Sequence, residues 1–196
     1  MFANRMAKLL FNLTVEHNIT NHLLAADVDM TRDEYNKLRG LENHDQRRAA
    51  ARFPREEMLL AWTALSYFMK GATLLYAGQE VCAEHTPSLF EKEPIDWSAG
   101  RDISGYLAQL AAIKKRLPTD EVFQLETDDA QGLVCASYLG PATRAVGVFP
   151  LAGRPGTAAV PLADGRYCDA LSGETVTVRE GTLSVGTRAV SLLENG

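Results

Sequence analysis

One strand–helix–strand pattern restricts this chain to a narrow set of folds. Residues 38–42 alternate apolar and polar side chains, as a strand does, and residues 72–77 form a continuous apolar run of strand length. Between them, residues 55–70 predict an amphipathic helix that starts after Pro54 and stops at Gly71. A strand, a helix and a strand in this order predict a parallel βαβ unit, with the second strand buried on both faces.

The pattern changes to an alternation of period two from residue 121 onward. Short β-rich runs are separated there by turn signals that contain glycine, proline or aspartate, and this spacing favours an antiparallel β-sandwich. The predicted strands cover residues 133–139, 145–149, 175–178, 182–185 and 189–193.

A boundary is predicted after residue 118. The helix predicted before it is capped by Asp102 and followed by Pro118. Of the 20 basic and 25 acidic residues, five arginines and ten acids follow this point, so the last part carries a net charge of −5 and the first is neutral. We therefore predict one unit over residues 1–118, which opens with N-terminal helices, and a β-sandwich over residues 119–196.

Composition excludes several classes of protein. With 46% hydrophobic residues in 196, the chain can bury a core, and its apolar stretches are too short to span a membrane. Neither part is basic, so nucleic acid is not an expected partner. The first residues lack the apolar region of a signal peptide, which predicts a cytoplasmic location. Cys82, Cys135 and Cys168 lack metal-ligand spacing and predict buried free thiols, with neither a metal nor a cofactor.

Polar side chains follow the first predicted strand at Asn43, His44 and Asp45. In βα-repeat proteins, residues at this end of a strand face the ligand. Residues 41–46 read LENHDQ, which resembles the last of the four short sequence regions of the α-amylase family of glycoside hydrolases. Three later features of this family are matched in order, namely the eighth barrel strand (71–80, GATLLYAGQE), the loop after it (89–97, LFEKEPIDW) and the sandwich that follows the barrel (165–193).

The resemblance implies roles for the three polar residues. Asp45 would be the carboxylate that stabilises the transition state, and His44 and Asn43 would bind the substrate. Gln79 and Glu80 are placed at the end of the second strand, where they line the same face or, for Glu80, pair with an arginine at 47–48. Gly40 departs from the family, which carries a large apolar residue there, and glycine weakens a buried strand.

The chemistry of bond cleavage is incomplete in this sequence. Retaining glycosidases need a nucleophile and an acid/base carboxyl group, and the family's Gly-x-Arg-x-Asp nucleophile pattern does not occur at the right place. The fold implied is an α+β two-part structure, in which a partial (β/α) barrel remnant of the last two strands and helices precedes an antiparallel β-sandwich.

Two functions follow from this interpretation. The first is the C-terminal portion of an α-amylase-type glycoside hydrolase that acts on α-glucans, with catalysis belonging to the longer parent. The alternative is a non-catalytic carbohydrate-binding or assembly module. An enzyme complete in 196 residues ranks third. Because the two barrel strands would leave unpaired edges, the chain is also expected to form a homo-oligomer.

Overall fold

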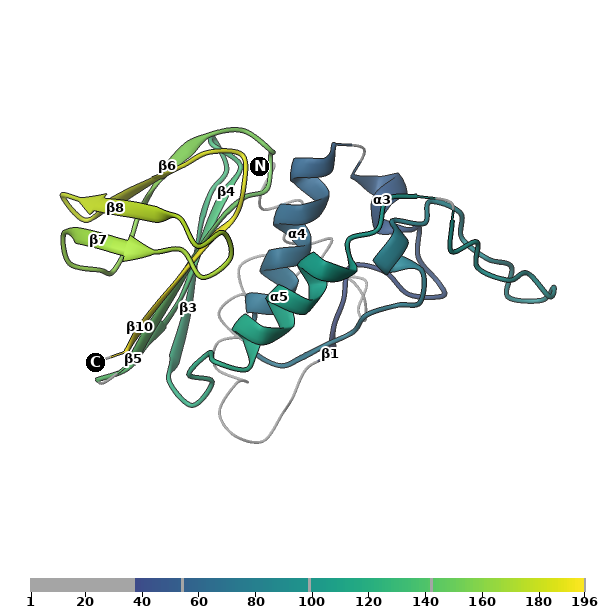
Figure 1. Ribbon diagram of the computed structural model, residues 1–196, viewed down its shortest axis with the longest axis horizontal. Coiled ribbons are helices and arrows are strands. Elements are labelled where there is room, and N and C mark those ends of the chain that lie inside the picture. Colours follow the sequence, from purple (N-terminus) through teal and green to yellow (C-terminus); the bar gives the residue numbers. More distant parts are fainter. Residues whose placement is uncertain (1–37, 54, 99, 142, 196) are drawn as a thin grey trace.

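The computed structural model of this chain describes residues 38–53, 55–98, 100–141 and 143–195 (Figure 1). Pro54 and the helices predicted before residue 38 lie outside these residues. Figure 1 shows the strands of the sandwich on the left, α4 and α5 in the middle, and a long loop around residue 90 on the right. No helix within the described ranges is long and apolar enough to cross a membrane.

Two short parallel strands and their helices form the first part of the fold. β1 pairs with β2, with Leu38 opposite Ala72 and Arg39 opposite Thr73, which confirms the predicted parallel strands on either side of a helix. The elements in chain order are β1 (Leu38–Arg39), α3 (Ala49–Arg52), α4 (Glu56–Phe68), β2 (Ala72–Thr73), the 3-10 helix η1 (Gln79–Val81) and α5 (Ser104–Lys114).

The strand predicted over residues 72–77 is wrong in length and in burial. Only Ala72 and Thr73 lie in the ladder, and Leu75 is 39% exposed. Among the described strands, β1 and β2 pair only with each other, so no third strand extends this sheet. The chain instead leaves the sheet and turns at Gly78, whose φ of +92° suits glycine.

The predicted antiparallel sandwich is confirmed. It consists of two four-stranded sheets, ordered β10-β5-β4-β3 and β6-β9-β8-β7. Three of its strands, β3, β6 and β7, were not among the predicted runs. The strands are β3 (Val122–Asp128), β4 (Leu133–Leu139), β5 (Thr143–Pro150), β6 (Gly156–Ala159), β7 (Gly165–Cys168), β8 (Thr175–Arg179), β9 (Thr182–Val185) and β10 (Val190–Asn195).

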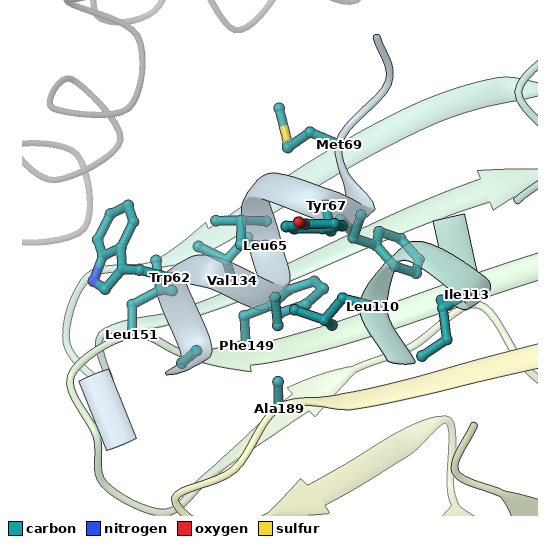
Figure 2. Close-up of a cluster of buried hydrophobic side chains, with 14 of the residues drawn as sticks. Trp62, Leu65, Tyr67, Met69, Leu110, Ile113, Val134, Phe149, Leu151 and Ala189 are labelled. Atoms are coloured by element: carbon teal, nitrogen blue, oxygen red, sulfur yellow. The ribbon is translucent and has the colours of Figure 1, made fainter. Parts of the chain in front are cut away.

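The central strands β4 and β5 of the β10-β5-β4-β3 sheet are buried on both faces. Along β4, Val134 packs into a cluster with the helices, whereas Leu133 packs into a second cluster between the two sheets. This period of two explains why β4 is apolar almost throughout. Figure 2 shows the first cluster, in which Phe149 of the sheet lies close to Leu65 of α4 and Leu110 of α5. The fold thus has three layers: the helices pack on the β10-β5-β4-β3 sheet, and the other face of this sheet packs on the β6-β9-β8-β7 sheet.

The C-terminal end of α4 is held by side chains from other elements. A helix leaves its last carbonyl groups without helical partners. Here the Tyr138 hydroxyl of β4 donates a hydrogen bond of 2.9 Å to the Phe68 carbonyl oxygen. Lys114 Nζ of α5 donates to the carbonyl oxygens of Tyr67 and Met69, at 3.0 and 2.8 Å. The sandwich and α5 therefore meet at this helix end, which we call the α4 junction.

β1 completes the α4 junction. Arg39 Nε donates a hydrogen bond of 2.6 Å to the Lys70 carbonyl oxygen, so four consecutive carbonyl groups have side-chain donors. Burial lowers the pKa of Arg39 to about 10, and Tyr138 acts in the opposite direction. Burial and the nearby Arg39 lower the pKa of Lys114 to about 8. The junction thus gathers one buried and one partly buried cation, Arg39 and Lys114, at the negative end of the helix dipole.

Candidate functional site

The three predicted site residues lie together on one exposed turn after β1. Asn43 Oδ1 accepts a hydrogen bond of 2.9 Å from the Asp45 amide, and the Asn43 carbonyl oxygen accepts one of 3.2 Å from the Gln46 amide. His44 Nε2 is 3.2 Å from Asp45 Oδ2, and these side chains are 62% and 65% exposed. Asn43 therefore shapes the turn, while His44 and Asp45 form its accessible polar pair.

This pair has the chemistry of a hydroxyl-binding site. The Asp45 carboxylate can accept hydrogen bonds at two oxygens, and the His44 ring can donate or accept. A single carboxylate cannot supply both groups that glycoside hydrolysis requires. The turn can therefore bind and orient a sugar, but it does not by itself contain the groups for cleavage. No group of three or more potential metal-binding side chains occurs in the part of the chain that the structure describes.

A buried ion pair lies at the base of this turn. Arg48 Nη2 is 3.1 Å from Glu42 Oε1, and the two side chains are 0% and 1% exposed. Glu42 Oε2 also accepts a hydrogen bond from the Ala49 amide at the start of α3. Burial raises the pKa of Glu42, and the Ala49 amide and Arg48 act in the opposite direction. Glu42 thus joins the end of β1 to the first residue of the following helix.

Arg48 extends the contact to the loop that follows β2. Its Nη2 donates a hydrogen bond of 2.9 Å to the Ala77 carbonyl oxygen, and its Nε donates one of 3.3 Å to that of Ala83. Its guanidinium lies 4.9 Å from the centre of the Tyr76 ring. A Cβ atom on Gly78 would come within 2.6 Å of Arg48 Nη2, so glycine leaves the room that this arginine needs.

The surroundings of the turn differ from expectation at two residues. Gln79 and Glu80 belong to η1 rather than to the end of a strand, and Gln79 is buried. Glu80 Oε2 accepts a hydrogen bond of 2.9 Å from the Gly78 amide, whereas the carboxylate beside Arg48 belongs to Glu42. The sequence interpretation missed the role of Glu42. A glutamate that ends the strand predicted over residues 38–42 was the signal that could have found it.

Close packing explains why position 40 is a glycine. A Cβ atom there would lie 3.0 Å from the Leu74 Cβ and 3.3 Å from its Cδ2 and carbonyl oxygen. The glycine thus permits β1 to approach the segment after β2 closely, and the Leu74 amide donates a hydrogen bond of 2.6 Å to the Arg39 carbonyl oxygen.

The three cysteines and Trp97, which lie outside this turn, differ in how exposed they are. Cys135 is buried as predicted, Cys82 is partly buried, and the prediction of burial is wrong for Cys168, which is exposed near the start of a turn. Trp97 is 56% exposed on the long loop.

Fold and site together define a class of protein, namely a βα layer with a polar turn after its strand, followed by an antiparallel β-sandwich. Residues 124–192 match the family model described as the bacterial alpha amylase C-terminal domain. The comparison with curated protein sequences gives no match. The family model and the solved structures together support the C-terminal region of an alpha-amylase family protein as the part to which this chain is similar.

Solved structures agree with this assignment. An alpha-amylase from Lactobacillus plantarum is 28% identical, with a TM-score of 0.79 over 89% of this chain and 42% of its own length. A noncanonic maltogenic alpha-amylase from Thermotoga neapolitana is 18% identical, with a TM-score of 0.75 over 98% of this chain and 49% of its own. An alpha-amylase from Geobacillus thermoleovorans, solved with acarbose, is 15% identical, with a TM-score of 0.65 over 87% of this chain and 42% of its own. The chain thus spans less than half the length of these proteins.

Proposed function

We propose that this chain acts as the C-terminal part of an α-glucan-acting glycoside hydrolase, in which Asn43, His44 and Asp45 contact the sugar. The observation that carries the proposal is the exposed His44–Asp45 pair, 3.2 Å apart on a turn directly after a parallel strand. The assignment to the alpha-amylase family supports it, and α-glucans are the substrate class which that assignment implies.

The roles divide between the two exposed side chains. Asp45 would stabilise the positive charge of the oxocarbenium-like transition state, and His44 would hydrogen-bond sugar hydroxyl groups. The nucleophile and the acid/base group would come from the longer parent enzyme, because no motif in this sequence matches them. The chain on its own is therefore expected to bind α-glucan without hydrolysing it.

The test measures binding and hydrolysis on the full 196-residue chain. Maltoheptaose is titrated into the chain and into Asp45→Asn and His44→Ala, and starch hydrolysis is followed in parallel. We expect no hydrolysis, and an affinity that falls about tenfold in each variant, or about 1.4 kcal/mol. Asp120→Asn, which changes an exposed residue elsewhere, is the matched control and should bind normally.

Two outcomes would contradict the proposal. If the wild-type chain does not bind maltoheptaose, the turn is not a sugar site in this chain. If hydrolysis survives repurification and disappears in Asp45→Asn, the chain contains a complete catalytic site.

We also propose that the chain self-associates through the β1–β2 sheet. Neither strand has a second neighbour among the described strands, and Leu38 and Leu75 expose apolar surface beside these open edges. Unpaired strand edges recruit other strands, and a twofold interface is the simplest closed arrangement. Light scattering at micromolar concentration tests this, and a monomer whose melting temperature is independent of concentration would contradict it.

A further inference from the structure

We infer that the buried Glu42–Arg48 pair is a positioning device for the His44–Asp45 turn, so that both residues are needed for sugar binding although neither touches the sugar. The inference rests on the proposed sugar-binding role of this turn. It assigns a function to two charged residues that lie beneath the candidate site.

The first argument is the weak contribution of such pairs to stability. Removing two charges from water costs free energy that their mutual attraction barely offsets, so a buried ion pair often stabilises a fold no better than apolar residues do. The hydrogen bonds that these two residues make with the Ala49 amide and with the Ala77 and Ala83 carbonyl oxygens are directional, however, and they fix geometry. The Glu42–Arg48 pair is fully buried and therefore fits a role in geometry better than a role in stability.

The second argument is that the pair closes the turn. Glu42 and Arg48 lie on either side of residues 43–47, and the Ala49 amide binds the second oxygen of the same carboxylate. The exposed pair His44 and Asp45 is thus held inside a short loop whose two ends are joined by side chains. With the ends joined, the loop has fewer conformations to lose when a ligand binds.

The third argument is that Arg48 fixes the turn relative to a second loop. Its hydrogen bonds to the Ala77 and Ala83 carbonyl oxygens lie on either side of η1, in the segment that follows β2. Both loops follow parallel strands of the same sheet, the position from which βα proteins contact their ligands. Arg48 therefore sets the relative positions of the two loops that would border a bound sugar.

The experiment compares variants of the pair in the full chain, with maltoheptaose as the probe. The variants are Glu42→Gln, which keeps the size and an acceptor oxygen, Arg48→Met, and the double variant. We expect each single variant to lower the affinity about tenfold, and the double variant to be no weaker than Arg48→Met, because coupled residues act as one unit. Glu42→Ala should bind more weakly than Glu42→Gln, since the glutamine can still accept from the Ala49 amide. Arg101→Met, which breaks the exposed ion pair with Glu56, is the matched control.

Amide hydrogen exchange supplies a readout that does not depend on the sugar. In Glu42→Gln and Arg48→Met, exchange at Asp45 and Gln46 should accelerate about tenfold, while amides in β4 keep their wild-type rates, because only the turn is released. Equal acceleration in β4 would show a general loss of stability and would overturn the inference. Unchanged exchange in the turn, or unchanged affinity, would also overturn it.

A second variant protects the test against a folding failure of Arg48→Met. Gly78→Ala would place a Cβ atom 2.6 Å from Arg48 Nη2 and displace the guanidinium without altering either charge. It should accelerate exchange at Asp45 as Arg48→Met does, and a normal rate there would count against the inference. If the wild type does not bind maltoheptaose, the proposed sugar site fails, whereas the exchange rates still decide whether the pair positions the turn.

Discussion

The α4 junction makes a quantitative prediction for Tyr138→Phe. The Tyr138 side chain is fully buried, and its hydroxyl is 2.9 Å from the Phe68 carbonyl oxygen. Removing the hydroxyl leaves that carbonyl group without this donor in a buried position, which costs about 2 kcal/mol. The ring contacts with Phe68 and Phe123, at centroid distances of 5.7 and 4.9 Å, are retained. The free energy of unfolding should therefore fall through the lost hydrogen bond alone.

Tyr106→Phe is the matched control. Tyr106 donates a hydrogen bond of 3.1 Å to the Leu60 carbonyl oxygen, which lies inside α4 where the next turn of the helix supplies another donor. Its loss should cost about 0.5 kcal/mol. Urea unfolding can be followed by the fluorescence of the buried Trp62. At about 2–4 °C per kcal/mol, the Tyr138→Phe melting temperature should fall by about 4–8 °C. A loss equal to or smaller than that of Tyr106→Phe would refute the reasoning.

Three further changes have expected outcomes. Gly40→Ala should lower the free energy of unfolding by about 1 kcal/mol, because the new Cβ would crowd Leu74, and a melting curve without a decrease would contradict this. The pKa of Lys114 falls from 10.5 to about 8 on folding, so the unfolded chain binds more protons between these values, and the stability contributed by this group rises from pH 8 to 10.5. Relative to Lys114→Met, the wild type should gain about 1 kcal/mol over that range after allowance for solvent screening, as measured by urea unfolding at each pH. Asp169→Ala should cost about 3 kcal/mol, because it leaves the buried Ser191 amide without its 2.8 Å acceptor, and Asp169→Asn should cost less by the same assay.

The sequence predicted the elements that are rich in apolar residues and bounded by clear stop signals. Residues 55–70 lie between Pro54 and Gly71, residues 133–139 precede Gly140, and these segments became α4 and β4 with ends shifted by two residues at most. β3 was overlooked, although Phe123 is buried between the exposed Val122 and Gln124. Its later residues are acidic and polar, and an edge strand open to solvent lacks the apolar excess that marks a central one.

Interactions between segments could not be predicted in the same way. The sequence placed Asn43, His44 and Asp45 on one turn because they are adjacent, and local order is enough for that. The partner of Glu42 is a different problem, because several arginines lie close to it in the sequence and only the path of the turn selects Arg48. The predicted length of the strand at residues 72–77 was wrong for a similar reason. An apolar run indicates that burial is favourable, but it does not show whether a neighbouring strand is present to pair with it.

The α4 junction also sets an order of assembly during synthesis of the chain. Its donors are separated from their carbonyl acceptors by 31 residues for Arg39, 45 and 47 for Lys114, and 70 for Tyr138. Contacts between residues so far apart form late, because the intervening chain must first be closed into a loop. On the ribosome, the last turn of α4 emerges long before Tyr138 has been added. The Phe68 carbonyl group therefore lacks its side-chain donor until β4 has been made, and this helix end is completed only together with the sheet that covers it.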